Sequence, residues 1–315
     1  MSPRCFGVLG DPISHSRSPV MHTAAFAELG GEAGGFSYLP FHVSAGELGA
    51  ALRGAAALGF GGLNLTLPHK RAALEYCDWL SPAARRIGAV NTLRFVPGAE
   101  PGAPTAIHGH NTDGQGFLDG LDELVGGVVG RSGALDLREA TVLGTGGASL
   151  AVVDALLERY PELSLRWVSR RPEAPPAQAS DPRVRARLRV CGWPDLLATG
   201  AGRGGAGDGA GDGDCGGPAR GQLLVNTTIV GLAGGPDRFP IALDLSALDP
   251  GAGVVDIVYP RPAGGLLDRA AARGLAVQDG LPMLLHQGAR ALEIWLQATL
   301  APRTIEAMRA ALYGL

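Results

Sequence analysis

Short apolar runs alternate along the chain with longer segments, rich in alanine and leucine, in which apolar residues recur at helical spacing. In the first third of the sequence this pattern predicts strands at 5–9, 36–42 and 62–67, and helices at 19–29, 45–58 and 70–79. Strands that alternate with helices in this way are typical of a mostly parallel sheet covered by helices. The N-terminal part is therefore expected to form an α/β domain.

The same rhythm begins again near residue 140. It predicts strands at 140–144 and 165–169 with a helix at 149–160 between them, two buried strands that begin at 223 and 253, and a last apolar helix at 282–298. We expect this series to form a second α/β domain. Residues 200–221 are a tract of glycine, aspartate and alanine, which is predicted to be a mobile loop because it cannot bury apolar surface. An active-site lid is the alternative.

The sequence VLGTGGASLA at 142–151 stands between a predicted strand and a predicted helix. It is a variant of the glycine-rich dinucleotide turn: Gly144 permits the tight turn, Gly146 leaves room for a pyrophosphate, and Ala151 lets helix and strand pack closely. The start of the helix offers free N–H groups and the positive end of its dipole to phosphates. An ordinary tight turn between strand and helix is the alternative.

The next strand ends in Ser169-Arg170-Arg171. An enzyme that uses NAD usually carries a carboxylate at this place to bind the ribose 2′-hydroxyl, whereas guanidinium groups suit the 2′-phosphate of NADP. The cofactor is therefore predicted to be NADP rather than NAD. Two solvated surface arginines are the alternative.

Three polar clusters interrupt the apolar pattern of the first half, at 10–22, at 64–70, and at 88–92 together with 109–113. Asn64 and Thr66 alternate with leucines on a predicted strand, so they point to the same face. Because α/β proteins bind ligands at the carboxyl ends of their strands, these clusters predict a ligand site.

Six motifs in these regions, GDPISHSRSPVMH, NLTLPHK, GAVNT, NTD, GTGGAS and GLPMLLHQGA, occur in the order seen in shikimate dehydrogenases. The chain resembles this family from about residue 5 to residue 298, with a gap over the glycine-rich tract. The resemblance implies a substrate-binding α/β domain made of 1–112 and 280–315, interrupted by a Rossmann-type, doubly wound NADP-binding domain at 113–279, with a cleft between them. It also implies reversible, NADPH-dependent reduction of 3-dehydroshikimate to shikimate, on the route to chorismate and the aromatic amino acids.

The resemblance also assigns roles to residues. Lys70 and Asp113 would be the catalytic pair. The substrate would be bound by these two together with Ser16, Ser18, Asn64, Thr66, Asn91, Tyr259 and Gln287. The cofactor would be bound by Gly144, Thr145, Gly146, Gly147, Ala148, Ser169, Arg170, Arg171, Asn226, Thr227, Thr228, Ile257, Gly280 and Met283.

The chemistry agrees with the catalytic pair. Hydride addition to a ketone creates an alkoxide that needs a proton, and the reverse oxidation needs a base at that hydroxyl. A lysine amine is ordinarily too basic, with a pKa of about 10.4 in model peptides, although desolvation lowers such a pKa. Asp113 would orient Lys70 and share the hydroxyl, and the sequence leaves open which residue carries the proton in each direction. Singly, the two residues could also be a surface lysine and a helix N-cap.

The chain departs from the family pattern at four places. Ser169-Arg170-Arg171 stands where many members have Asn-Arg-Thr, Ile229-Val230 replaces smaller residues, Ala263-Gly264-Gly265 replaces a commoner Thr-Pro step, and the glycine-rich tract is additional. None of these changes falls in the substrate clusters. Ser16 and Ser18 resemble the shikimate enzymes rather than quinate-using relatives, which often have Thr at the second position.

Composition narrows the alternatives. With 27 basic and 30 acidic residues in 315, the chain lacks the basic excess that nucleic acids or anionic membranes require. It has no run of about 18 apolar residues, so we expect no membrane span, and the short apolar run at its start predicts no secretory leader. Its four cysteines are scattered, which favours reduced thiols in the cytoplasm and no metal site. We expect a monomer or homodimer. His15, His22 and His69 also lack metal-type spacing, and we expect them to be locally hydrogen-bonded or exposed. A quinate/shikimate dehydrogenase that uses NAD, or a non-catalytic dinucleotide-binding sensor, is the competing interpretation.

Overall fold

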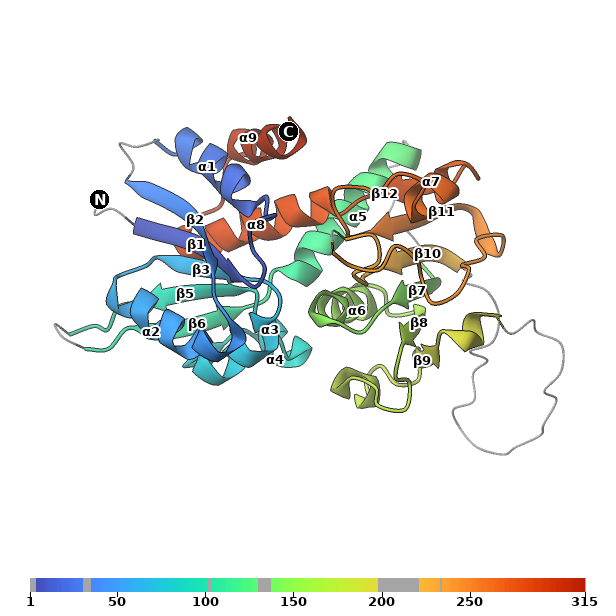
Figure 1. The fold of residues 1–315 in the computed structure, drawn as a ribbon, viewed down its shortest axis with the longest axis horizontal. Coiled ribbons are helices and arrows are strands. Elements are labelled where there is room, and N and C mark those ends of the chain that lie inside the picture. Colours follow the sequence, from blue (N-terminus) through green and yellow to red (C-terminus); the bar gives the residue numbers. More distant parts are fainter. Residues whose placement is uncertain are drawn as a thin grey trace. The chain divides into compact units, whose positions relative to one another are not determined.

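Two six-stranded sheets organise the chain, each in its own compact unit. The computed structural model describes residues 4–30, 35–100, 103–129, 137–197, 221–232 and 234–314. Unit 1 comprises Met1–Phe117 and Met283–Leu315, and unit 2 comprises Leu118–Pro282 (Figure 1). The predicted glycine-rich loop lies outside the described residues, apart from Gly221, which begins a strand.

The sheet of unit 1 has the order β2-β1-β3-β5-β6-β4. Its strands are β1 (Arg4–Gly10), β2 (Phe36–His42), β3 (Gly62–Leu65), β4 (Trp79–Leu80), β5 (Thr92–Val96) and β6 (Ala106–His110). β1 pairs in parallel with β2 and β3, as the strand–helix rhythm predicts. β5 is antiparallel to both its neighbours, so the sheet is mixed.

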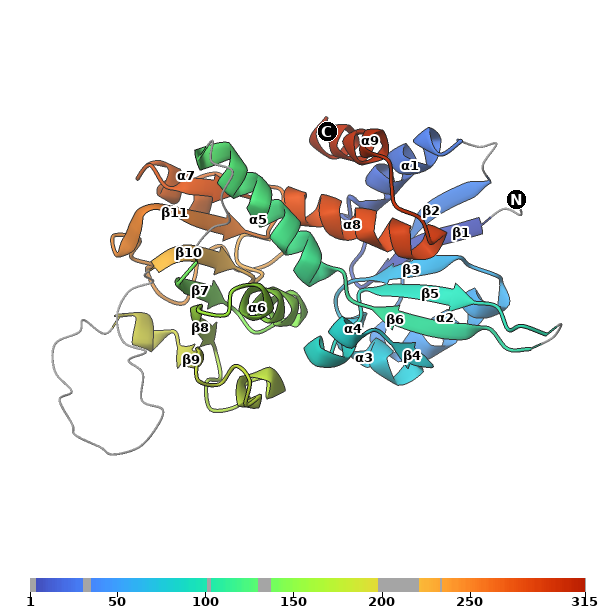
Figure 2. The ribbon, with the colours of Figure 1, turned by 180° about the vertical axis from the view of Figure 1, so that it is seen from behind.

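Helices cover both faces of this sheet (Figure 2). They are α1 (Ser18–Glu28), α2 (Leu48–Ala57), α3 (His69–Ala72), α4 (Pro82–Ile87), α8 (Leu281–Leu296) and α9 (Pro302–Tyr313), together with the start of α5 (Asp113–Val129). The Phe6 ring of β1 packs on Phe26 of α1 and Trp295 of α8, whereas Leu9 faces α2 within the opposite core. The indole of Trp295 also donates to the carbonyl of Leu93, which fixes α8 against β5.

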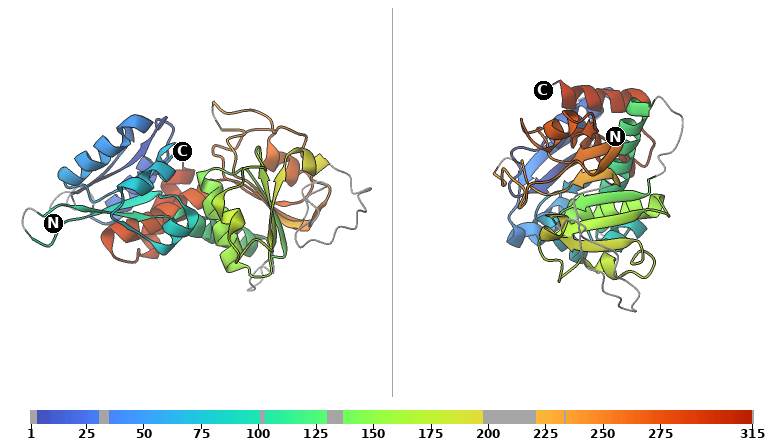
Figure 3. Two further views of the ribbon diagram at one scale, coloured as in Figure 1. Left: turned by 90° about the horizontal axis from the view of Figure 1, so that it is seen from below. Right: turned by 90° about the vertical axis from the view of Figure 1, so that its right-hand side faces the viewer.

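The sheet of unit 2 is parallel throughout, in the order β12-β11-β10-β7-β8-β9 (Figure 3). Its strands are β7 (Glu139–Leu143), β8 (Ser164–Ser169), β9 (Leu188–Gly192), β10 (Gly221–Asn226), β11 (Leu248–Asp256) and β12 (Ala276–Gln278), and its helices include α6 (Gly147–Arg159) and α7 (Leu266–Ala271). The chain builds outward from β7 in one direction and then from β10 in the other. This is the doubly wound Rossmann order, and its switch point between β7 and β10 is where such sheets bind nucleotides.

Two predicted elements end earlier than expected. β3 stops at Leu65 rather than residue 67, because the carbonyl of Thr66 turns to accept from the backbone N–H of His69 at 2.9 Å. The helix predicted at 70–79 is only α3 followed by a 3₁₀ helix at Ala73–Tyr76. The chain is then drawn into the sheet by Asp78, which exchanges hydrogen bonds with the backbone of Ile107.

Among the described residues, none of the helices combines the length and apolar character that a membrane span requires. Cys5 and Cys77 are free thiols, as the scattered cysteines predict.

Candidate active site and nucleotide turn

One edge of the unit 1 sheet collects the predicted catalytic residues. β1, β3 and β6 run in the same direction and β5 runs against them, so three carboxyl ends and the amino end of β5 share this edge. The chain leaves it through 11–18, 66–70 and 111–113, and Asn91 immediately precedes β5. Polar segments that are distant in sequence converge here because of the strand directions.

Lys70 and Asp113 form a direct ion pair at this edge. The Lys70 Nζ donates to Asp113 Oδ2 at 2.6 Å, and the two side chains are only 16% and 5% exposed. Asp113 is the first residue of α5, where the helix dipole favours a carboxylate. Lys70 is therefore not a freely exposed surface lysine, and both oxygens of the Asp113 carboxylate accept hydrogen bonds from side chains. A buried amine held against a carboxylate can exchange a proton with a bound hydroxyl or ketone.

Asn91 holds the other oxygen of this carboxylate. Its Nδ2 donates to Asp113 Oδ1 at 2.8 Å and to Thr112 Oγ1 at 2.9 Å. Its Oδ1 accepts from Thr92 Oγ1 and from the backbone N–H of Thr112, each at 2.9 Å. Both amide hydrogens and the amide oxygen of Asn91 are therefore engaged within unit 1, and the orientation of the Asp113 carboxylate is fixed.

Asn64 extends the same buried network. Its Oδ1 accepts from the Tyr38 hydroxyl at 2.8 Å, and its Nδ2 donates to Thr92 Oγ1 at 3.1 Å and to the carbonyl of Asn91 at 3.2 Å. Tyr38, Thr92 and Thr112 are members of this network that were not assigned from the sequence. For the two threonines the signal was their place in the GAVNT and NTD motifs, whereas nothing in the pattern around Tyr38 indicates its contact.

The remaining predicted substrate residues of unit 1 lie around this network. Ser16 Oγ accepts from the backbone N–H of Ser18 at the start of α1, and Thr66 follows directly after β3. Gln287 of α8 lies with its Oε1 3.4 Å from Asn91 Nδ2 and donates to the carbonyl of Leu284 at 2.9 Å. The structure thus brings Asn64, Asn91, Lys70, Asp113 and Gln287 together.

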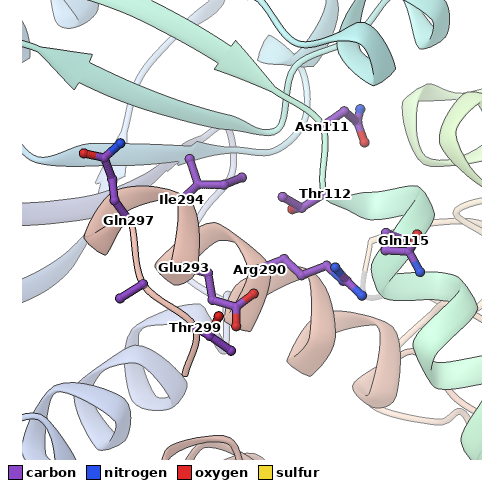
Figure 4. Close-up of a pocket in the computed structure, with 9 residues that line it drawn as sticks. Asn111, Thr112, Gln115, Arg290, Glu293, Ile294, Gln297 and Thr299 are labelled. Carbon is purple, nitrogen blue, oxygen red and sulfur yellow. The ribbon is translucent and has the colours of Figure 1, made fainter. Parts of the chain in front are cut away.

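A groove of about 460 Å³ lies beside this network in unit 1 (Figure 4). It is lined by Asn111, Thr112, Gln115, Arg290, Glu293, Ile294, Gln297, Ala298 and Thr299. Its lining shares Thr112 with the network but does not include Lys70 or Asp113, so the groove is separate from the catalytic pair.

In unit 2, the predicted nucleotide turn joins β7 to α6. Gly144 has φ +97°, a conformation that favours glycine. A Cβ added at Gly146 would meet no atom within 4 Å, so the turn leaves open space in front of the start of α6. Ala151 is fully buried, as close packing of helix and sheet requires. Gly147 and Ala148 form the first turn of α6.

The segment Asn226-Thr227-Thr228 lies against this turn across the switch point. Both the backbone N–H and the Oγ1 of Thr227 donate to the carbonyl of Leu143, at 2.9 and 2.6 Å. A Cβ on Gly144 would come within 2.9 Å of the Thr228 side chain. Asp256 fixes the side chain of Asn226, because its Oδ1 accepts from Asn226 Nδ2 at 2.8 Å.

The arginine pair follows β8 on the same side of the sheet. Ser169 Oγ lies 3.5 Å from Thr145 Oγ1 and accepts from the backbone N–H of Arg171 at 3.0 Å. Arg170 and Arg171 are exposed. The hydroxyl of Ser169 thus contacts both the nucleotide turn and the segment that carries the two guanidinium groups.

The other assigned residues lie after β11 and around the start of α8. The backbone N–H of Ile257 donates to the carbonyl of Asn226, and Gly280 approaches the carbonyl of Ile257 so closely that a Cβ would lie 2.0 Å from it. Tyr259 follows in unit 2, and Met283 is a buried residue of α8 in unit 1. Ile257 and Gly280 are therefore brought together with the Asn226 segment.

The histidines differ from one another. His69 is buried with its Nε2 2.8 Å from the carbonyl of Val43, as expected of a locally bonded side chain. His22 is fully buried, stacks on Tyr38, and has no hydrogen-bond partner for either ring nitrogen among the described residues, so the expectation of a bonded or exposed side chain is wrong for it. Burial lowers the pKa of His22 to about 3. No cluster of three metal-ligating side chains occurs in the described parts of the chain.

Unit 2 is doubly wound and carries a glycine-rich turn at its switch point, and unit 1 carries a buried lysine–carboxylate pair. Together these features define the class of nucleotide-dependent oxidoreductases. More particularly, the chain belongs to the shikimate dehydrogenase family, as its motifs predict. Residues 8–93 match the model of the shikimate dehydrogenase substrate binding domain, and residues 280–313 match that of the shikimate 5′-dehydrogenase C-terminal domain.

Individual relatives span nearly the whole chain. It is 41% identical to a shikimate dehydrogenase (NADP(+)) of Methylobacterium radiotolerans, over 93% of this chain and 91% of the relative, and 39% identical to that of Rhodospirillum rubrum, over 99% and 97%. Among solved structures, shikimate 5-dehydrogenase from Thermus thermophilus in complex with NADP(H) and shikimate is similar with a TM-score of 0.74 and 36% identity, covering 98% of this chain and 99% of that one.

Proposed function

We propose that this chain catalyses the reversible, NADPH-dependent reduction of 3-dehydroshikimate to shikimate. The observation that carries the proposal is the buried contact of Lys70 with Asp113 at the ligand-binding edge of the sheet. The names of relatives that cover more than nine-tenths of the chain support the substrate and the cofactor. Unit 1 would then bind the substrate and unit 2 the NADP, with the enzyme cytoplasmic and a monomer or homodimer as the sequence predicts.

Lys70 would carry the proton of the reaction, and Asp113 would hold Lys70 in place. NADPH supplies the hydride when bound. Lys70 holds hydrogens on Nζ, and in reduction it would give one to the oxygen that gains negative charge. Asp113, held on one oxygen by Asn91 and on the other by Lys70, would keep the amine in place, and in the reverse oxidation Lys70 would take the proton back from the substrate hydroxyl.

The substrate carboxylate would be bound by the hydroxyls of Ser16, Ser18 and Tyr259, and its ring hydroxyls by Thr66 and Gln287. Both amide hydrogens of Asn64 are donated within unit 1, so this residue would meet a substrate hydroxyl through its carbonyl oxygen. Asn91 Nδ2 would have to share one of the two hydrogen bonds that it donates in order to contact the substrate. The main role of Asn91 would therefore be to orient Asp113.

The cofactor would lie along the nucleotide turn and the segment beside it. Gly144 to Ala148 would bind the pyrophosphate, Ser169 to Arg171 the 2′-phosphate, and Asn226 to Thr228, Ile257, Gly280 and Met283 the nicotinamide half. The open space at Gly146 and the two exposed guanidinium groups support this placement.

The test is the decay of NADPH absorbance with 3-dehydroshikimate as the sole co-substrate. We expect turnover with NADPH that greatly exceeds turnover with NADH or with 3-dehydroquinate. Equal use of both acids with NADH would favour the quinate/shikimate alternative, and NADPH binding without turnover would favour a non-catalytic sensor.

A further inference from the structure

The indole of Trp167 makes an unusual contact from inside the core of unit 2. Trp167 lies in β8 and is fully buried. Its Nε1 lies 2.7 Å from the carbonyl oxygen of Gly144 and 2.7 Å from Ser149 Oγ, and its single hydrogen is shared between them. A buried indole N–H needs an acceptor, and here the acceptor is the backbone of the nucleotide turn.

The same carbonyl receives a second hydrogen bond. Ser149, in the first turn of α6, donates from Oγ to the Gly144 oxygen at 2.6 Å. Trp167, Ser149 and the Gly144 carbonyl therefore form a closed triangle, with donors from the neighbouring strand and from the helix. The direction of this carbonyl is fixed toward the core.

The direction of the carbonyl sets the direction of the next N–H. The Gly144–Thr145 peptide bond is trans, since the cis bonds of the described residues all precede prolines. In a trans peptide the C=O and N–H point in opposite directions. With the Gly144 oxygen turned inward to Trp167, the N–H of Thr145 points away from this core.

We propose that Trp167 is a positioning residue for NADP binding: it orients the Gly144–Thr145 peptide so that the Thr145 N–H faces the bound pyrophosphate. The inference rests on the proposed function, because it takes the nucleotide turn to be the NADP site. Trp167 itself does not touch the cofactor. Its effect is confined to the cofactor side and leaves the Lys70–Asp113 chemistry unchanged.

Unit 2 contains a matched control. Trp193 is also buried in this core, and its Nε1 has no hydrogen-bond partner in the part of the chain that the structure describes. Trp167→Phe and Trp193→Phe each remove an indole and leave an aromatic ring, but only the first removes a hydrogen bond to the turn.

The experiment measures the Kd of NADPH by titration for the wild type and for both variants. At saturating NADPH it also measures kcat and the Michaelis constant for the dehydroshikimate substrate. We expect Trp167→Phe to raise the Kd about tenfold, as loss of a shared buried hydrogen bond implies, and to change the two kinetic constants by less than about twofold. Trp193→Phe should leave the Kd unchanged. A Kd for Trp167→Phe within twofold of the wild type, or an equal rise in both variants, would overturn the inference.

A second variant decides the matter if Trp167→Phe does not fold. Ser149→Ala keeps the indole bond and removes the other donor to the same carbonyl, so we expect it to raise the Kd about threefold or more. An unchanged Kd would contradict the inference. Failure of the proposed function is distinct, because it would appear in the wild type itself, as no oxidation of NADPH with 3-dehydroshikimate.

Discussion

Arg170 and Arg171 follow one another at the end of β8, and both guanidinium groups are exposed. Only Arg170 stands at a position where the family resemblance keeps an arginine. The Ser169 hydroxyl accepts from the backbone N–H of Arg171 and so fixes the backbone of the second arginine. We therefore propose that Arg170 contributes more than Arg171 to the selectivity for NADP.

Arg170→Ala should weaken NADPH binding by about 1.5–3 kcal/mol, or roughly 10- to 150-fold, because a charge-assisted hydrogen bond to the 2′-phosphate is lost. Binding of NADH, which has no such phosphate, should not change. Arg171→Ala is the matched control and should have the smaller effect. Titration of both nucleotides tests this assignment, and unchanged NADPH affinity in Arg170→Ala would refute it.

Asp256 carries a buried carboxyl group that accepts a hydrogen bond from Asn226, and the residue is 3% exposed. Burial raises its pKa to about 6, hydrogen bonds from Val258 N–H and Asn226 Nδ2 oppose the rise, and the nearby charge of Asp279 adds to it. The folded state thus binds this proton more tightly than the unfolded state. The corresponding stabilisation is present below about pH 4 and is lost as pH rises to about 6.

Asp256→Asn should remove this contribution, since the amide keeps an acceptor for Asn226 but does not titrate. The difference in free energy of unfolding between variant and wild type should shift in favour of the variant by about 3 kcal/mol between pH 4 and pH 7. Urea unfolding of both proteins across this range measures it. A difference that is independent of pH would show that Asp256 has an ordinary pKa.

Within unit 1, the start of α5 and the α8 helix meet at a glycine. A Cβ added at Gly116 would lie 2.5 Å from the backbone nitrogen of Gln287 and 2.7 Å from its Cβ. The helix that presents Asp113 can therefore approach the helix that presents Gln287 only because residue 116 has no side chain. The glycine sets the distance between two elements of the candidate site.

Gly116→Ala should displace α8 and with it Gln287, so we expect a loss of stability of about 1–3 kcal/mol and a higher KM for the substrate. Gly126 lies in the same helix, and a Cβ there would meet nothing within 4 Å. Gly126→Ala should instead stabilise the helix by up to about 1 kcal/mol. Thermal unfolding and steady-state kinetics separate the two variants, and equal behaviour would contradict the role of Gly116.

At the scale of elements, hydrophobic periodicity predicted the helices whose positions depend on local sequence. α1, α2, α6 and α8 lie within a few residues of their expected ranges, because their apolar faces recur at helical spacing. The antiparallel position of β5 was not predicted, since strand direction depends on long-range pairing with β3 and β6. The helix expected at 70–79 was too long, because Asp78 bonds to a residue of β6 that no local pattern reveals.

For the whole molecule, the doubly wound order of unit 2 and the α/β character of unit 1 followed from the strand–helix rhythm and the family resemblance, and both are confirmed. The motifs indicated which residues matter. They did not reveal that both amide hydrogens of Asn91 are donated within the protein, nor that Trp167 bonds to the nucleotide turn. Those contacts depend on the packing of segments that are far apart in sequence.

The proposed reaction depends above all on the amine of Lys70 as a proton carrier for an NADPH-dependent reduction. The most direct measurement is the rate of NADPH oxidation by 3-dehydroshikimate at saturation for the wild type, Lys70→Ala and Arg71→Ala, an exposed neighbour in α3. We predict that Lys70→Ala lowers kcat by roughly 10²–10⁴ with the Kd of NADPH unchanged, and that Arg71→Ala turns over like the wild type. Turnover of Lys70→Ala at the wild-type rate would contradict the account.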